Sequence, residues 1–171
     1  MKKLISVFLL TLITALLCSC DSFVKPEEFT PQLSFGLHMT AKKNNREFEA
    51  DIRCTDYDSI SLFFTHPEEL NGFSVTSSEK GFSVNVFGIP DEISDYEINP
   101  ESLLNVLFET IRTAVFSQHG AFIINEDSAE ATLSVDGIPV KVSFSKDGYI
   151  REISAESIDF YAQFEKSVDK S

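Results

Sequence analysis

The chain has 171 residues, with 14 Lys and Arg against 27 Asp and Glu, so its formal net charge is −13. This acidic balance argues against binding to nucleic acid and against lying flat on an anionic bilayer, because both would repel the chain. With 43% hydrophobic residues, including sixteen Phe, the length suffices for one packed domain.

The N-terminus has the features of an export signal. Lys2 and Lys3 precede an uncharged apolar segment over residues 4–17. A helix of that length would reach about 21 Å, short of the roughly 30 Å hydrocarbon core of a bilayer. The segment is therefore predicted to be a signal peptide rather than a membrane span.

The run Leu17-Cys18-Ser19-Cys20 follows this segment and resembles the bacterial lipoprotein signal. In that signal an apolar residue stands three before the modified cysteine and a small residue stands directly before it. The resemblance implies cleavage after residues 1–19 and lipidation of Cys20 by at least two acyl chains, such as palmitate. At about 0.8 kcal/mol per buried methylene, two chains give lasting attachment. The alternatives are an ordinary secretory signal and an uncleaved anchor helix.

The remaining chain divides into three parts. Residues 20–32 hold the lipidated cysteine and a charged, Pro-containing tether, which is expected to be extended. A single domain over residues 33–166 and a polar tail over residues 167–171 follow. Without Lys2 and Lys3, twelve basic and 27 acidic residues leave a net charge of −15. We expect the domain to face the extracytoplasmic side of the cell membrane, held there by lipid.

From residue 33 the hydrophobic pattern has a period of two, which is typical of strands with one buried face. Asp136-Gly137, between two such runs, is a strong hairpin signal. The alternation favours an antiparallel sheet with one wet face over a parallel sheet buried on both faces. The predicted inward residues include Leu33, Phe35, Leu37, Met39, Phe48, Ala50, Ile52, Cys54, Ile60, Leu62, Phe64, Phe73, Val75, Phe82, Val84, Val86, Ala131, Leu133, Val135, Val140, Val142, Phe144, Ile158, Phe160, Ala162 and Phe164.

One helix is predicted between the strands. Asn99 is the expected N-cap, Pro100 takes the first helical position, and Gly120 follows the last turn. Apolar residues at three- and four-residue spacing form a stripe that is expected to pack on the apolar face of the sheet. These residues are Leu103, Leu104, Leu107, Phe108, Ile111 and Val115.

The predicted sheet is too wide for this helix to cover. About nine strands at roughly 4.8 Å spacing span about 43 Å, whereas a helix with its side chains is about 10 to 12 Å across. We therefore expect a mainly β fold (α+β) in which a curved antiparallel sheet forms a half-barrel around the amphipathic helix. Such a fold can leave an apolar pocket between sheet and helix. The alternative is two packed layers with a filled core.

This order of elements behind a lipoprotein signal resembles the LolA/LolB superfamily, which includes lipoprotein carriers and lipoproteins of the LppX and LprG kind. The segment His66-Pro67-Glu68-Glu69-Leu70-Asn71-Gly72, followed by strands up to Gly88, is similar to a proline-led connector before a hairpin in such proteins. The resemblance covers most of residues 33–165. It implies a half-barrel fold and a lipid-handling role, and it carries over no individual functional residue.

No catalytic motif is present, so we expect a protein that is not an enzyme and has no cofactor, metal site or nucleic-acid partner. His38, His66 and His119 are expected to be surface or capping residues rather than catalytic bases. The carboxylates of Asp56 and Asp58, and those of Glu126, Asp127 and Glu130, lack the spacing of a calcium loop. Cys54 is expected to pack in the core rather than to serve as a reactive thiol.

Two functions remain as hypotheses. In the first, the domain binds or transfers a lipid or another apolar ligand in a cavity between sheet and helix. The predicted lining residues are Leu62, Phe64, Val84, Val86, Leu104, Leu107, Phe108 and Ile111. In the second, the domain is a non-catalytic scaffold of the cell envelope that binds another exported protein. An enclosed apolar cavity would favour the first hypothesis, and a filled core would favour the second.

Overall fold

The computed structural model of the protein describes residues 29–56, 59–78, 81–93, 99, 101–116 and 122–167. Several sequence-based predictions lie outside these residues and stay predictions. They concern the signal peptide, Cys20, most of the tether, Asp58, Pro100, His119, Gly120 and most of the C-terminal tail.

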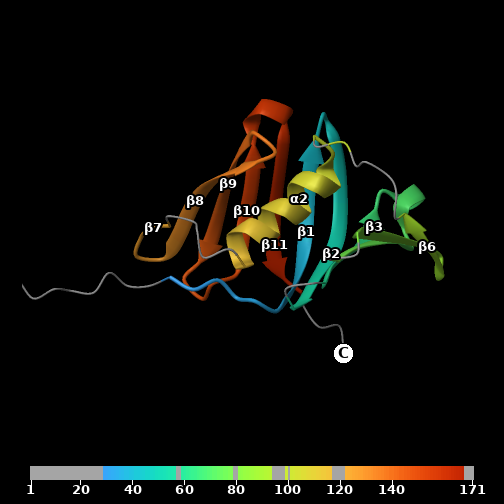
Figure 1. Ribbon diagram of the computed structural model, residues 1–171, viewed down its shortest axis with the longest axis horizontal. Coiled ribbons are helices and arrows are strands. Elements are labelled where there is room, and N and C mark those ends of the chain that lie inside the picture. Colours follow the sequence, from blue (N-terminus) through green and yellow to red (C-terminus); the bar gives the residue numbers. More distant parts are fainter. Residues whose placement is uncertain are drawn as a thin grey trace, which may run out of the picture.

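The described residues form one antiparallel sheet and one main helix, which confirms the predicted mainly β fold (Figure 1). The strand order is β6-β5-β4-β3-β2-β1-β11-β10-β9-β8-β7. The strands are β1 (Phe35–Lys43), β2 (Arg46–Asp56), β3 (Ser59–His66), β4 (Phe73–Ser78), β5 (Gly81–Val86), β6 (Ile89–Ile93), β7 (Ile123–Ile124), β8 (Ser128–Val135), β9 (Ile138–Ser145), β10 (Ile150–Ala155) and β11 (Phe160–Lys166).

The sheet curves around the helix without closing, as expected of a half-barrel (Figure 1). Because all these strands belong to one sheet, the two-layer sandwich is excluded. The structure adds β6 and β7, the two outermost strands, to the nine that were predicted. Neither has a readable alternation, since Pro90 interrupts β6 and β7 has only two residues.

The helix α2 (Leu103–Ile111) begins later than predicted. Ser102 is its N-cap, and the Ser102 hydroxyl accepts a hydrogen bond of 3.1 Å from the backbone N–H of Asn105. Asn99 instead accepts a hydrogen bond from the backbone N–H of Glu101, in the turn before the helix. Both are good capping residues, so composition alone did not separate them. One π-helical segment, η2 (Arg112–Phe116), continues α2, and two short 3-10 segments are η1 (Glu68–Leu70) and η3 (Glu156–Ile158).

The core lies between α2 and the inner face of the sheet. Most of the predicted inward residues are buried, and Val106, Leu107, Phe108 and Ile111 of α2 are fully buried among them. Leu33 was predicted to face inward, but it lies before β1 and is 54% exposed. Cys54 is also buried, as predicted. The outer face carries polar cross-strand pairs, among which His38 Nδ1 lies 3.0 Å from Asp51 Oδ1.

The chain enters the domain through residues 29–32, the last part of the predicted tether, which pack against the sheet. The Phe29 ring lies 5.0 Å from that of Phe122 and 5.3 Å from that of Phe144. The Gln32 backbone N–H donates a 2.9 Å hydrogen bond to the carbonyl of Gly148 in the β9–β10 turn. An ideal Cβ at Gly148 would lie 2.7 Å from the Thr30 carbonyl oxygen, so this approach requires glycine.

This contact predicts that Gly148→Ala destabilises the protein more than Gly137→Ala. Both glycines have φ near +83°, but a Cβ at Gly137 meets nothing within 4 Å. Gly137→Ala should therefore lower the free energy of unfolding by about 1–2 kcal/mol, the penalty of the left-handed conformation. Gly148→Ala must in addition displace residues 29–32. Urea unfolding of both variants measures the difference, and equal destabilisation would contradict the proposed close packing.

Candidate functional site

The structure separates the eight predicted lining residues into two groups. Leu62, Leu107, Phe108 and Ile111 are fully buried in the core, and Phe64 is nearly so. Leu104 and Val84 are partly buried against the core, and Val86 is 38% exposed. Four surface hollows with volumes of about 180 to 530 Å³ are lined by described residues, and none of the eight lies in their walls. An enclosed cavity with all eight in its lining therefore stays a prediction.

An apolar surface beside the core is the first candidate site. It lies on strands β4–β6, which we call the wing. The register pairs Phe73 with Val86, Val75 with Val84 and Ser77 with Phe82, so these side chains share the inner face. We define the wing surface as Phe73, Phe82, Val84 and Val86, none of which is fully buried.

Two aromatic contacts connect the wing surface to the core. The Phe82 ring lies 5.7 Å from the buried Phe108 ring of α2, and the Phe73 ring lies 6.1 Å from that of Phe64. Exposure rises from β4 to β5. Val75 is buried and its partner Val84 is partly buried, whereas Phe73 is partly buried and its partner Val86 is exposed. An apolar ligand placed there would extend the core. The predicted set did not include Phe73 and Phe82, although their alternation with polar residues placed them on the same face.

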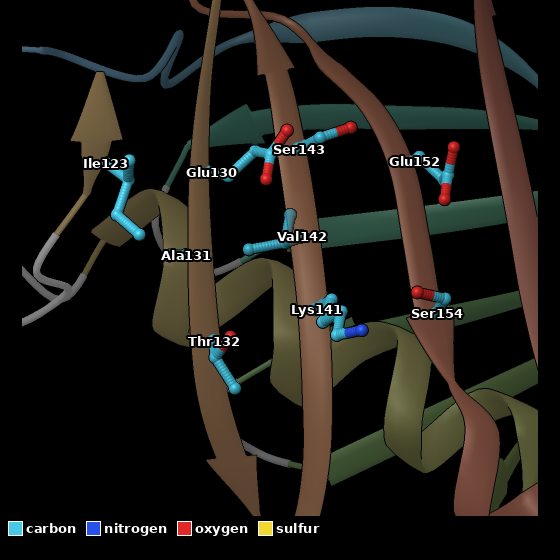
Figure 2. Close-up of a pocket in the computed structure, with 9 residues that line it drawn as sticks. All are labelled: Ile123, Glu130, Ala131, Thr132, Lys141, Val142, Ser143, Glu152 and Ser154. Carbon is cyan, nitrogen blue, oxygen red and sulfur yellow. The ribbon is translucent and has the colours of Figure 1, made fainter. Parts of the chain in front are cut away.

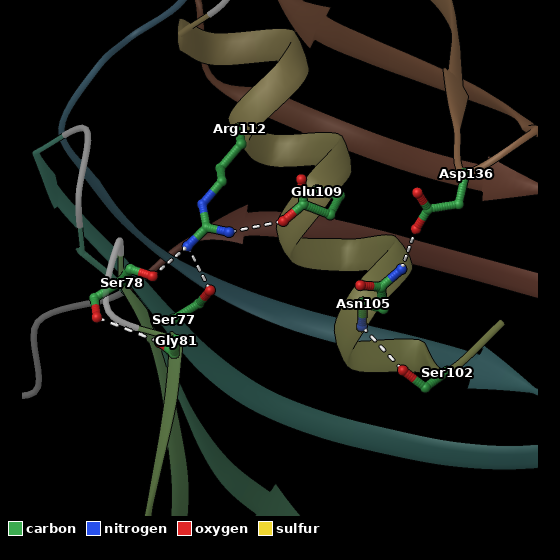
Figure 3. A network of polar contacts seen from close by, with 8 residues as sticks. All are labelled: Ser77, Ser78, Gly81, Ser102, Asn105, Glu109, Arg112 and Asp136. Atoms are coloured by element: carbon green, nitrogen blue, oxygen red, sulfur yellow. Dashed lines mark hydrogen bonds and ion pairs between the residues drawn. The ribbon is translucent and has the colours of Figure 1, made fainter. Parts of the chain in front are cut away.

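Arg112 joins the end of α2 to the wing (Figure 3). Its guanidinium donates 2.6 Å and 3.3 Å hydrogen bonds to the Ser77 hydroxyl and the Ser78 carbonyl, and a 2.7 Å one to the Glu109 carboxylate. Ser77 is fully buried, so its hydroxyl depends on this donor. The contact fixes the distance between helix and wing on one side of the wing surface.

A second polar contact holds the other end of the helix. The Asn105 side-chain amide donates a 2.9 Å hydrogen bond to Asp136 in the turn between β8 and β9 (Figure 3). The two contacts lie at opposite ends of α2 and on opposite sides of the central strands. Helix α2 therefore bridges the two halves of the sheet.

The second candidate site is a hollow of about 530 Å³ on the outer face of β8, β9 and β10 (Figure 2). Six of its nine wall residues are polar, and the wall consists of Ile123, Glu130, Ala131, Thr132, Lys141, Val142, Ser143, Glu152 and Ser154. Beside it, the Tyr161 hydroxyl donates a 3.2 Å hydrogen bond to Glu152. Partial burial and the Glu152 charge raise the pKa of Tyr161 above its ordinary 10.0. Its described wall residues include no nucleophile paired with a base, and we assign no reaction to this hollow.

The other residues singled out in the sequence lie apart. His38 pairs with Asp51 on the outer face, and His66 is exposed at the end of β3. The carboxylates of Glu126, Asp127 and Glu130 are exposed, and no group of three or more metal-binding side chains is found within the described residues. Among the same residues, no helix has the length and apolar character needed to cross a bilayer.

The Arg112 contacts predict a loss of stability in Arg112→Ala of about 1–3 kcal/mol, because the buried Ser77 hydroxyl loses its donor. Arg112→Lys should recover only part of this, since an ammonium lacks the fork that reaches two partners. Lys141→Ala is the control: its 3.4 Å ion pair with Glu156 is exposed, so about 0.5 kcal/mol or less is expected. Thermal or urea unfolding measures all three. Equal effects of Arg112→Ala and Lys141→Ala would contradict the claim that the buried Ser77 hydroxyl depends on Arg112 as its donor.

Among the comparisons with known proteins, only the one with solved structures found a similar protein. No family model and no curated protein matches the chain. Among solved structures, a LolA superfamily protein from Nitrosomonas europaea is similar over 84% of this chain and 83% of its own, with a TM-score of 0.36 and 8% identity.

Proposed function

We propose that the protein is an exported lipoprotein that binds an apolar ligand, such as a lipid acyl chain, on the wing surface beside α2. The observation that carries the proposal is the incomplete burial of Phe73, Phe82, Val84 and Val86 on the inner face of the sheet. Each methylene of a chain buried there contributes about 0.8 kcal/mol. The proposal includes no catalytic step.

The proposed location at the cell membrane follows from the N-terminal sequence. Lipidation of Cys20 would hold the protein at the cell membrane with its domain on the extracytoplasmic side. A site for apolar ligands is useful there, because acyl chains are abundant and poorly soluble in water. The net charge of −15 after cleavage keeps the body of the domain in solution.

A second candidate function is favoured by a different observation. Phe87, in the β5–β6 turn, is 79% exposed and has φ near +52°, which is costly for a bulky residue. Its ring packs on Gly72, where an added Cβ would lie 3.0 Å from the ring. A strained, exposed aromatic residue held in one position is suited to insertion into another exported protein. In that case the protein would be a scaffold rather than a carrier.

Binding of a fluorescent fatty-acid probe tests the first function. Val86→Asp places a charge on the wing surface and is expected to abolish uptake of the probe. Phe63→Asp is the matched control: Phe63 is 40% exposed and lies on the outer face of the neighbouring β3. It should leave uptake unchanged. Mass spectrometry of protein purified gently from its host should also detect a bound lipid.

Two results would count against this proposal: no uptake by the wild-type protein, or equal loss in Val86→Asp and Phe63→Asp. If uptake is absent and crosslinking in membranes recovers a partner that Phe87→Asp loses, the scaffold is the better account.

A further inference from the structure

The point at which the chain enters the domain is fixed by several contacts. The Phe29 ring packs against Phe122 and Phe144, and the Gln32 side chain donates a 3.1 Å hydrogen bond to the Asp147 carbonyl. Residues 29–32, blue in Figure 1, run along the end of the sheet where the β9–β10 turn lies. Residues 29–32 therefore move with the domain as part of it, and the chain enters the domain at Phe29.

Covalent geometry limits the distance from this point to the proposed anchor. Phe29 follows Cys20 by nine positions, and a fully extended chain covers at most about 3.3–3.6 Å per residue, or roughly 30 Å. The far edge of the sheet, β6, lies ten strand spacings from β7, or about 48 Å measured along the curved sheet. The entry point therefore stays within roughly 30 Å of the lipid, whereas β6 can lie much farther away.

An exposed apolar surface lies at this same entry point. Ile123 and Ile124 form the edge strand β7 and are 68% and 42% exposed. Ile124 shares a hollow of about 180 Å³ with Phe29, Glu126 and Lys146. We call these five residues the β7 corner. Apolar residues on an exposed edge strand are an aggregation hazard unless something covers them.

We propose that the β7 corner rests on the surface of a zwitterionic bilayer, so that the domain is oriented as well as anchored. This inference depends on the lipidation of Cys20 proposed above. Ile123 and Ile124 would enter the interfacial region. The Lys146 ammonium and the Glu126 carboxylate match the two charges of a zwitterionic headgroup. An anionic surface fits less well, because the acidic body of the protein would be repelled from it.

The test uses the mature, lipidated protein reconstituted in phosphatidylcholine nanodiscs. Cys54 is buried, so a cysteine introduced at an exposed position can be labelled selectively with an environment-sensitive dye. Ile124→Cys reports on the β7 corner, and Phe87→Cys, in the turn beside β6 at the opposite edge, is the matched control. Headgroup-level spin-labelled lipid then quenches any dye at the bilayer surface.

The proposal predicts loss of fluorescence at position 124 and none at position 87. Adding Ile123→Asp to Ile124→Cys should remove the quenching while the protein stays bound to the nanodisc. Equal quenching at both positions, or none at 124, overturns the proposed orientation when mass spectrometry shows that Cys20 is acylated. If mass spectrometry shows an unmodified Cys20, the proposed lipid anchor and the proposed orientation both fail. The acylation state of Cys20 therefore distinguishes failure of the orientation alone from failure of the anchor.

Discussion

The packing of α2 across the inner face of the sheet is the interaction on which the rest of the structure depends. Its fully buried residues Leu107, Phe108 and Ile111 each contribute about 1.5–3 kcal/mol relative to remaining exposed. Polar contacts at its two ends, to Asp136 and to Ser77, join strands that lie on opposite sides of β1 and β11. Without this helix the apolar face would be open to water over its whole width.

A single helix covers only part of so wide a sheet, so the centre of the sheet and its two edges differ in how far they are buried. The central strands and α2 form a fully buried core, which provides stability. The apolar residues Phe73, Phe82 and Val84 of the wing are only partly buried, and Val86 is exposed. The opposite edge holds the N-terminal segment and the β7 corner. The two proposals place ligand binding on the wing and membrane contact at the β7 corner, apart from the core that provides stability.

Much of the fold could be predicted because it depends on local patterns. The period-two runs placed nearly every long strand, and the three- and four-residue spacing of Leu107, Phe108 and Ile111 placed the inner face of the helix. The buried state of Cys54 followed from its place in such a run. The choice of Ser102 over Asn99 as N-cap did not follow, since both residues suit that position.

The candidate site was harder to predict because it depends on tertiary contacts. Leu62 and Val86 lie in runs with the same alternating pattern, yet Leu62 is fully buried and Val86 is exposed. Their burial differs because Val86 lies in β5, two strands nearer the edge of the sheet than β3. The contact from Arg112 to Ser77 joins residues 35 positions apart and has no sequence signal. Likewise, nothing in a charged, Pro-containing segment shows that Phe29 finds an aromatic pocket formed by Phe122 and Phe144.

Native-state hydrogen exchange, resolved by residue, tests most directly the claim that α2 buries the centre of the sheet and leaves the wing less covered. The account predicts that amides of β1, β2, β10 and β11 exchange only through global unfolding. Amides of β4 and β5 should exchange through a smaller opening of lower free energy. Uniform protection across all of these strands would contradict the claim, because it would mean that the wing is packed as firmly as the core.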